Sequence, residues 1–161
     1  MESLSSAPVQ SLSISHGAPI EANPDRLVSL AGALLRAAER SPNKGIRYLN
    51  ADGTDTRQTY PQLVENSARW LGGLRAAGMK AGDKLIFQLD RNEEFVTAFW
   101  ACMMGGIVPV PISIPPGYDE PHGILAKLQN AWAMLGNPPV LVSDAMVTPV
   151  ERFGQRQSLS G

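Results

Sequence analysis

The first sustained pattern of apolar positions in the chain has the period of an α-helix. Apolar residues recur every three or four positions across residues 27–38, which places them on one face of a helix. Asn23-Pro24 provides an N-cap residue and a first-turn proline before this stretch, and Ser41-Pro42 interrupts the period after it. We therefore expect an amphipathic helix that begins at Asn23-Pro24 and ends at Ser41-Pro42.

The pattern then changes to two short runs with the length of β-strands. Residues 45–50 and 54–59 flank Asp52-Gly53, and the glycine of such a dipeptide accepts the positive φ that a tight hairpin turn requires. A second helical period extends over residues 60–74 and is followed by Gly78, a residue type that is common just beyond helix C-termini. A β-hairpin and a second amphipathic helix are therefore expected.

Beyond Gly78, short apolar runs of strand length alternate with helical patterns. The runs of strand length are residues 85–89, 107–112 and 140–142. Two strands joined by an intervening helix form a βαβ unit, in which the strands are parallel. The pattern predicts two such units in succession, and so an α/β fold.

The two helices between these strands differ in character. The first, at about residues 91–104, is apolar on nearly all sides, so we expect it to be buried on more than one face. Asp90 and Glu93 have the spacing of a capping box at its start, and Gly105-Gly106 is expected to end it. The second has its apolar residues on one face of residues 124–135, and the glycine that follows is expected to end it.

The two ends of the chain carry less pattern than its middle. Residues 1–22 are rich in Ser, Pro, Gly and Ala without a sustained period, so we expect a flexible leader. Residues 148–151 predict about a half-turn of a further helix after the third strand. Because helices cover both faces of a parallel sheet, such an ending leaves one layer unfinished. We therefore expect residues 23–161 to be the N-terminal portion of a larger domain.

Composition and charge exclude several classes of partner. The chain has 161 residues, of which 43% are hydrophobic and 18% charged, and its formal net charge is −1. It therefore has no excess of positive charge for nucleic acid or for an anionic membrane surface. No apolar run approaches the ~20 residues that span a bilayer, and the first residues lack the pattern of a secretory signal. We expect a cytoplasmic protein without nucleic-acid or membrane partners.

Few side chains have the chemistry of a catalytic or metal site. A single cysteine, Cys102, cannot form an internal disulfide, and its place in an apolar helical run favours a packed core thiol. Asp119-Glu120 near His122 could bind a metal or act as an acid–base cluster, although a solvated loop is the commoner role of such a sequence. Three tryptophans lie in apolar helical stripes, where core packing is commoner than stacking on a ligand: Trp70, Trp100 and Trp132.

The glycine-containing segments do not have the form of a phosphate-binding loop. Gly72-Gly73 falls late in a helical pattern and lacks the order G-x-G-x-x-G. Gly105-Gly106 is expected at a helix C-terminus, where carbonyl groups repel phosphate. The strand-to-helix turn at residues 90–94 carries three acids. No residue of the chain is therefore assigned a catalytic, cofactor-binding or metal-binding role.

Three motifs, taken in their order along the chain, resemble those of the adenylate-forming enzymes. Gln58–Leu63 resembles the early Thr-Tyr-x-x-Leu motif of that family, and Gly78–Leu85 resembles its Gly-x-x-x-Gly-Asp-x-Val segment. Phe99–Pro111 resembles its second core motif, in which a helix end of small residues leads into a proline-bearing strand. The family includes acyl-CoA synthetases, fatty acyl-AMP ligases and the adenylation domains of nonribosomal peptide and polyketide synthases. The resemblance extends over about residues 27–142.

Two segments of the sequence make the resemblance more specific within that family. Residues 107–112 and 125–132 are similar to fatty acyl-AMP ligases and to the loading domains of hybrid polyketide–peptide synthases. The resemblance implies the fold of an incomplete Rossmann-like N-terminal subdomain, with parallel βαβ units after a helix and a hairpin. It also implies the family reaction, in which ATP and Mg²⁺ activate a carboxylate as acyl-AMP. The acyl group then passes to the thiol of coenzyme A or of an acyl-carrier protein.

The family motifs that perform this reaction are absent from the chain. A Ser/Thr/Gly-rich loop would hold the phosphates, an acid the ribose hydroxyls, and a lysine of a C-terminal subdomain the developing charge. In the family these lie beyond the matched region, so we expect no catalysis by this chain alone and a partner in the remainder of the adenylation domain. The alternative is a non-catalytic interaction or structural module derived from such a domain. An unrelated small nucleotide-binding protein is disfavoured by the missing phosphate loop.

Overall fold

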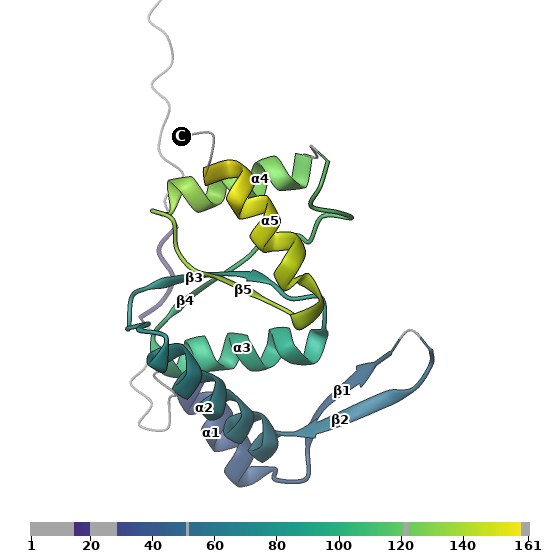
Figure 1. Cartoon of the computed structure of the whole chain (residues 1–161). Coiled ribbons are helices and arrows are strands. Elements are labelled where there is room, and N and C mark those ends of the chain that lie inside the picture. The colour runs from purple at the N-terminus through teal and green to yellow at the C-terminus, as the bar shows by residue number, and fades with distance from the viewer. Residues whose placement is uncertain (1–14, 20–28, 51, 121–122, 159–161) are drawn as a thin grey trace, which may run out of the picture.

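The computed structural model describes residues 15–19, 29–50, 52–120 and 123–158. It contains a two-stranded and a three-stranded sheet with five α-helices in these residues, as the α/β pattern predicted (Figure 1). Most of the expected leader, and the expected helix start at Asn23-Pro24, lie outside the described residues. No helix of the described part of the chain has the length and apolar character needed to cross a membrane.

The hairpin forms where the sequence predicted it, and the first helix ends where it was predicted but has its N-cap at Ser29 instead of Asn23. Helix α1 (Leu30–Arg40) is capped by Ser29, whose Oγ accepts a hydrogen bond from the backbone N–H of Gly32 at 3.0 Å, and it ends at Ser41. Strands β1 (Gly45–Leu49) and β2 (Asp55–Thr59) are antiparallel. The turn between them contains Gly53 at φ 83°. Figure 1 shows the hairpin projecting from the body of the molecule.

Helix α2 (Tyr60–Ala76) starts directly after the hairpin with a complete capping box. The Thr59 N–H donates to Gln62 Oε1 at 2.8 Å, and Thr59 Oγ1 accepts from the Gln62 N–H at 3.4 Å. The helix ends before Gly78, which has φ 91°. This second helix is therefore confirmed at both ends.

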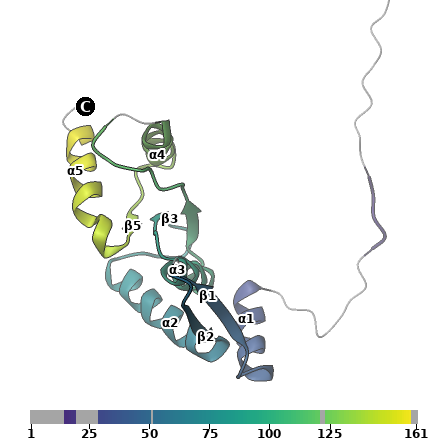
Figure 2. The same ribbon diagram turned by 90° about the vertical axis from the view of Figure 1, so that its right-hand side faces the viewer.

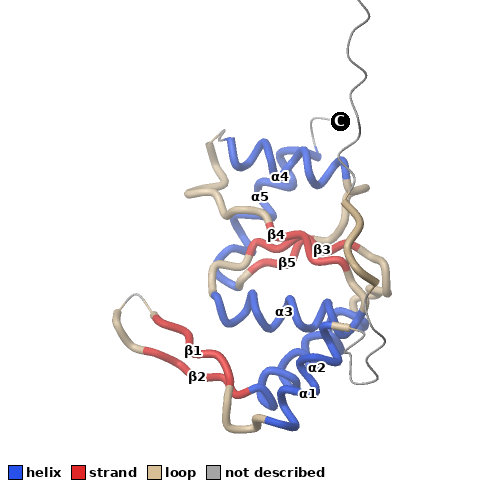
Figure 3. Tube along the Cα trace, turned by 180° about the vertical axis from the view of Figure 1, so that it is seen from behind, coloured by secondary structure: helices blue, strands red, loops and turns tan. Residues whose placement is uncertain are grey.

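The three-stranded sheet is parallel throughout, with the strand order β4-β3-β5. Its strands are β3 (Lys84–Gln88), β4 (Val108–Pro111) and β5 (Val140–Val142). Helix α3 (Asn92–Gly105) connects β3 to β4, and α4 (Gly123–Met134) lies between β4 and β5. The first connection steps to one side of β3 and the second returns to its other side, so right-handed crossovers place α3 and α4 on opposite faces. Figures 1 and 3 show this arrangement.

Helix α3 lies between the sheet and helices α1 and α2, so it is buried on more than one face, as its apolar sequence predicted (Figure 2). The side chains of β3 alternate between two hydrophobic cores. Leu85 and Phe87, together with Leu89 directly after the strand, belong to the core shared with α2 and α3, whereas Ile86 belongs to the core beneath α4 and α5. The sheet is therefore packed on both faces.

Two local expectations were wrong. Asp90 and Glu93 form no capping box, because α3 begins after Arg91 and has no side-chain hydrogen bond at its N-cap. The Asp90 N–H instead donates to Ser143 Oγ at 3.2 Å, a contact from the end of β5 that holds the chain extended before the helix. The expected half-turn at residues 148–151 is part of α5 (Val147–Ser158), which has 12 residues and follows a 3₁₀ turn, η1 (Asp144–Met146). Helices α4 and α5 together cover the second face of the sheet.

Candidate functional site

The carboxyl ends of the three parallel strands meet at one edge of the sheet. In open α/β folds this edge is the usual location of ligand sites. Here it is formed by the segment after β3, the loop after β4 and Ser143 directly after β5. The polar side chains of these segments are the candidates for chemistry in the described part of the chain.

Gln88, the last residue of β3, joins two of these segments. Its side chain is fully buried, and its Nε2 donates to the carbonyl oxygens of Ile112 at 2.8 Å and Phe87 at 3.0 Å. Its Oε1 accepts from the Tyr118 hydroxyl at 2.8 Å. Burial, and then the negative charge of Asp90, raises the pKa of Tyr118 to about 12, so the phenol stays a neutral donor. This network fixes the proline-rich loop after β4 across the end of the sheet.

A second network joins the end of β5 to the start of α3. Ser143 Oγ donates to Glu94 Oε2 at 2.7 Å and accepts from the Asp90 N–H at 3.2 Å. Glu94 Oε1 lies 3.3 Å from Arg91 NH1, which gives this carboxylate a cationic partner as well. Each oxygen of Glu94 therefore has a partner from the protein itself, and this arrangement stabilises the turn.

An open groove of about 380 Å³ lies beside this turn, between α2 and the start of α3. Arg69 and Arg91 line it from its two sides, together with the indole of Trp70. Both arginines already have carboxylate partners, since Arg69 lies 3.9 Å from Glu65 and Arg91 pairs with Glu94. The charged side chains of the groove are therefore largely neutralised by partners within the protein.

The residues of this edge do not fit a nucleotide with its metal ion. The turn from β3 to α3 contains no glycine, and two acids, Glu93 and Glu94, occupy the first turn of the helix where a phosphate would bind. Gly106 is the left-handed C-cap of α3, and Gly72-Gly73 lies inside α2. The described residues contain no group of three or more His, Cys, Asp or Glu side chains that could hold a metal ion.

The remaining candidates from the sequence have structural surroundings. Cys102 is buried, and burial raises the pKa of its thiol to about 11, so it is a core thiol as expected. Asp119 lies 3.2 Å from Arg156 of α5, Glu120 is exposed, and His122 lies outside the described residues. Trp70 and Trp132 each pack against one of the two cores.

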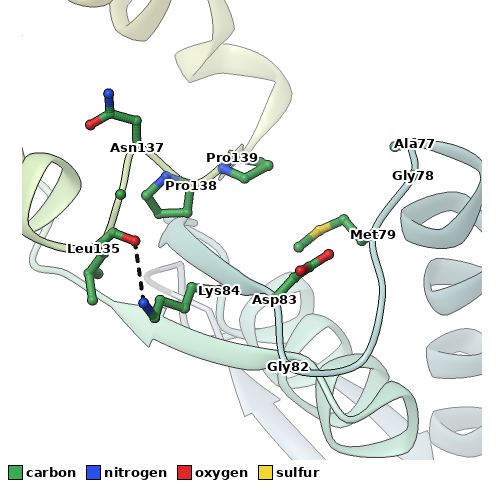
Figure 4. Close-up of a pocket in the computed structure, with 11 residues that line it drawn as sticks. Ala77, Gly78, Met79, Gly82, Asp83, Lys84, Leu135, Asn137, Pro138 and Pro139 are labelled. Carbon is green, nitrogen blue, oxygen red and sulfur yellow. Dashed lines mark hydrogen bonds between the residues drawn. The ribbon is translucent and has the colours of Figure 1, made fainter.

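A further cavity of about 410 Å³ lies at the opposite, amino end of the sheet (Figure 4). The segments that follow α2 and α4 line it, and Lys84 Nζ donates to the Leu135 carbonyl at 3.3 Å across it. That lysine complements the carbonyl end of α4, where the helix dipole is negative. This contact ties β3 to the end of α4.

Sequence reasoning did not identify the two networks at the carboxyl edge. A polar residue, Gln88, within an otherwise apolar strand was the available signal, because a buried amide needs hydrogen-bond partners. No comparable local signal links Ser143 to Glu94.

Comparison with known proteins gives the family. A profile of the AMP-binding enzyme family matches residues 34–134. A putative fatty-acid–CoA ligase of Mycobacterium tuberculosis is 32% identical over 136 residues, which are 80% of this chain and 22% of that protein. The solved structure of McyG A-PCP, complexed with phenylalanyl-adenylate, is 37% identical with a TM-score of 0.76, over 81% of this chain and 21% of that one.

A fatty acid AMP ligase of Legionella pneumophila is also similar, with 27% identity and a TM-score of 0.66 over 74% of this chain and 20% of that one. The chain thus spans about a fifth of the length of these three proteins. The family predicted from the motifs is confirmed. This chain belongs to the AMP-binding enzymes and corresponds to the N-terminal part of their adenylation domain.

Proposed function

We propose that this chain is the N-terminal scaffold of an ATP-dependent ligase that activates a carboxylate as acyl-AMP and loads the acyl group onto a phosphopantetheine thiol. The observation that carries the proposal is its similarity, at 37% identity, to a structure that contains an adenylation domain with a carrier domain. Similarity to both a fatty-acid–CoA ligase and a fatty acid AMP ligase supports a carboxylate as the substrate class.

The role of this chain in such an enzyme is structural. ATP and Mg²⁺ would be held by the remainder of the domain, because the carboxyl edge of this sheet does not fit them. The chain would contribute the first parallel strands and the buried networks of Gln88 and Ser143, which set the shape of that edge. We assign no step of the reaction to its side chains.

The test is to read the coding sequence beyond codon 161 and to express the longer product. We expect ATP–pyrophosphate exchange that depends on a carboxylic acid, and transfer of the acyl group to a carrier protein, detected by mass spectrometry of the phosphopantetheine thioester. The 161-residue chain alone should show no exchange. Exchange by the short chain, or a longer product that forms no adenylate with any acid of a broad panel, would contradict the proposal.

A stop codon directly after codon 161 would favour the alternative function, a non-catalytic interaction or structural module. In that case the chain should bind a partner protein and should leave its own fold unchanged on binding.

A further inference from the structure

An aspartate–glycine pair, Asp52-Gly53, lies at the exposed tip of the β1–β2 hairpin (Figure 1). In such a pair the backbone nitrogen of the glycine can attack Cγ of the aspartic acid, because glycine has no side chain to obstruct the approach. A Cβ atom built on Gly53 would meet no other atom within 4 Å, so the surrounding protein leaves this space open as well. The pair is therefore a candidate site for a spontaneous rearrangement of the backbone.

The rearrangement proceeds through a cyclic imide and needs no co-reactant other than water. A bond forms between the Gly53 nitrogen and Cγ of Asp52, and the hydroxyl of the carboxylic acid leaves with the amide proton as water. A water molecule then opens the ring at one of its two carbonyls. Opening at Cγ restores aspartate. Opening at the main-chain carbonyl leaves the backbone running through Cβ and Cγ, and the product is isoaspartate.

The folded hairpin holds the Asp52 carboxyl group in an unreactive state. Its Oδ1 accepts from the Thr54 hydroxyl at 2.6 Å and from the Thr54 N–H at 2.9 Å. The bond from the hydroxyl, and then the bond from the backbone, lowers the pKa of Asp52, because both stabilise the ionised form. An ionised carboxylate has no hydroxyl that can leave as water. The two bonds therefore disfavour the first step of the rearrangement.

The nitrogen of Gly53 is restrained by the same turn. Its N–H donates to the Asn50 carbonyl at 3.0 Å. Asn50 also donates its backbone N–H to the Thr54 carbonyl at 2.8 Å and its Nδ2 to Thr54 Oγ1 at 3.0 Å. Asn50 and Thr54 thus bond to each other and, between them, to both reacting groups. We call this pair of residues the turn clamp.

We propose that Asp52-Gly53 is a latent site of isoaspartate formation, which the turn clamp keeps as aspartate while the hairpin is folded. Opening of the hairpin tip releases the carboxyl group and the glycine nitrogen together, so the rate of isomerisation follows the opening of the tip. The product has an additional backbone carbon between residues 52 and 53, which lengthens the turn and should weaken the pairing of Leu49 with Asp55. The proposal is independent of the proposed function.

The experiment incubates the 161-residue chain at neutral pH, folded in buffer and unfolded in guanidinium chloride, and follows isoaspartate at position 52 over time. Digestion and mass spectrometry with electron-transfer fragmentation detect the isomer, because cleavage of its additional backbone bond gives diagnostic fragments. We expect the unfolded chain to isomerise at least tenfold faster than the folded chain. Equal rates would overturn the proposal, and this comparison needs no variant.

Two matched substitutions test the turn clamp. Thr54→Val removes the hydroxyl but keeps the backbone N–H and the branched shape, so the folded variant should isomerise at least threefold faster than wild type. Thr56→Val makes the same change at an exposed position of β2 and should stay within twofold of wild type. Each folded rate is divided by the rate of the same variant in denaturant, which removes differences in intrinsic reactivity. A folded Thr54→Val chain that isomerises no faster than Thr56→Val would show that the turn clamp gives no protection.

Discussion

Two glycines of the chain, Gly72 and Gly106, have different backbone conformations. Gly72 lies inside α2, where a Cβ atom would meet no other atom within 4 Å. Gly106 ends α3 at φ 68°, and a Cβ atom there would lie 3.2 Å from the Cβ of Ala81. The sequence shows both as glycine beside a second glycine, and the backbone conformation decides what each one contributes.

Substituting alanine at these two glycines should change stability in opposite directions. Gly106→Ala should lower the free energy of unfolding by about 1–2 kcal/mol, because the left-handed conformation strains a residue with a Cβ atom. Gly72→Ala should raise it by about 0.5–1 kcal/mol, because alanine favours a helix interior over glycine. Urea denaturation of the two variants and the wild type measures both changes. A change of the same sign in both variants would contradict this assignment.

The buried phenol of Tyr118 predicts a loss of stability at alkaline pH. Its pKa in the folded chain is raised to about 12, while a tyrosine in an unfolded chain ionises near pH 10. The unfolded state therefore releases this proton first as the pH rises. The stability that the neutral phenol provides is fully present below about pH 10 and is lost between about pH 10 and 12. Burial, and then Glu93, also raises the pKa of Tyr48 to about 12, so Tyr48 adds to the same loss.

The measurement is the free energy of unfolding between pH 8 and 12. Tyr118→Phe should be less stable than wild type at pH 8, because Gln88 Oε1 loses its donor. Its stability should also fall less steeply above pH 10. An unchanged slope in the variant would show that Tyr118 does not titrate in this range.

At the scale of helices and strands, the sequence patterns predicted the elements whose signals lie in neighbouring residues. The helix expected over residues 60–74 follows from its period and from Gly78 beyond its end, and the hairpin follows from Asp52-Gly53. The expected capping box of Asp90 and Glu93 did not form, and Ser143, distant in the sequence, instead accepts from the Asp90 N–H and donates to Glu94. The Gln88–Tyr118 contact likewise joins residues 30 positions apart, which no local pattern indicates.

Two caps that look alike in the sequence should therefore respond differently to alanine. Thr59→Ala should lower the free energy of unfolding by about 1 kcal/mol, because the first turn of α2 loses a side-chain acceptor. Asp90→Ala should change it by less than about 0.5 kcal/mol, because the contact of Asp90 with Ser143 uses the backbone N–H, which alanine retains. Thermal or urea unfolding of both variants tests the contrast, and equal losses would restore a capping role for Asp90.

At the scale of the whole molecule, the α/β architecture and the parallel strands were predicted from the alternation of apolar runs, and the burial of α3 on more than one face was predicted from its apolar sequence. The strand order and the length of α5 were not, because they depend on which edges and faces remain free once the first strands have paired. Similar proteins are about five times as long as the matched segment. Strand β5 is at one edge of the three-stranded sheet, and an apolar groove lies between α4, α5 and the first residue of β5.

The isolated chain should therefore self-associate or be only marginally stable. We expect light scattering to show species larger than a monomer, and a hydrophobic dye to bind the folded chain, because open edges and apolar patches promote association. Val142→Pro removes a backbone N–H from the outer edge of β5 and should reduce the association. Pro109→Val, which adds an N–H at the outer edge of β4, is the matched substitution at the other edge of the sheet. A monodisperse wild-type monomer with a sharp two-state thermal transition would count against this expectation.

The prolines of β4 also bear on the order of events during synthesis. Strands β3 and β4 leave the ribosome before β5, so a β3–β4 pair can form while β5 is still being made. When β5 emerges, it meets two edges, and pairing with β4 would give a different sheet from the native one. Because Pro109 and Pro111 remove the donors of that edge, β5 is directed to the free side of β3. We therefore expect Pro109 and Pro111 to disfavour a pairing of β5 with β4 while the sheet assembles.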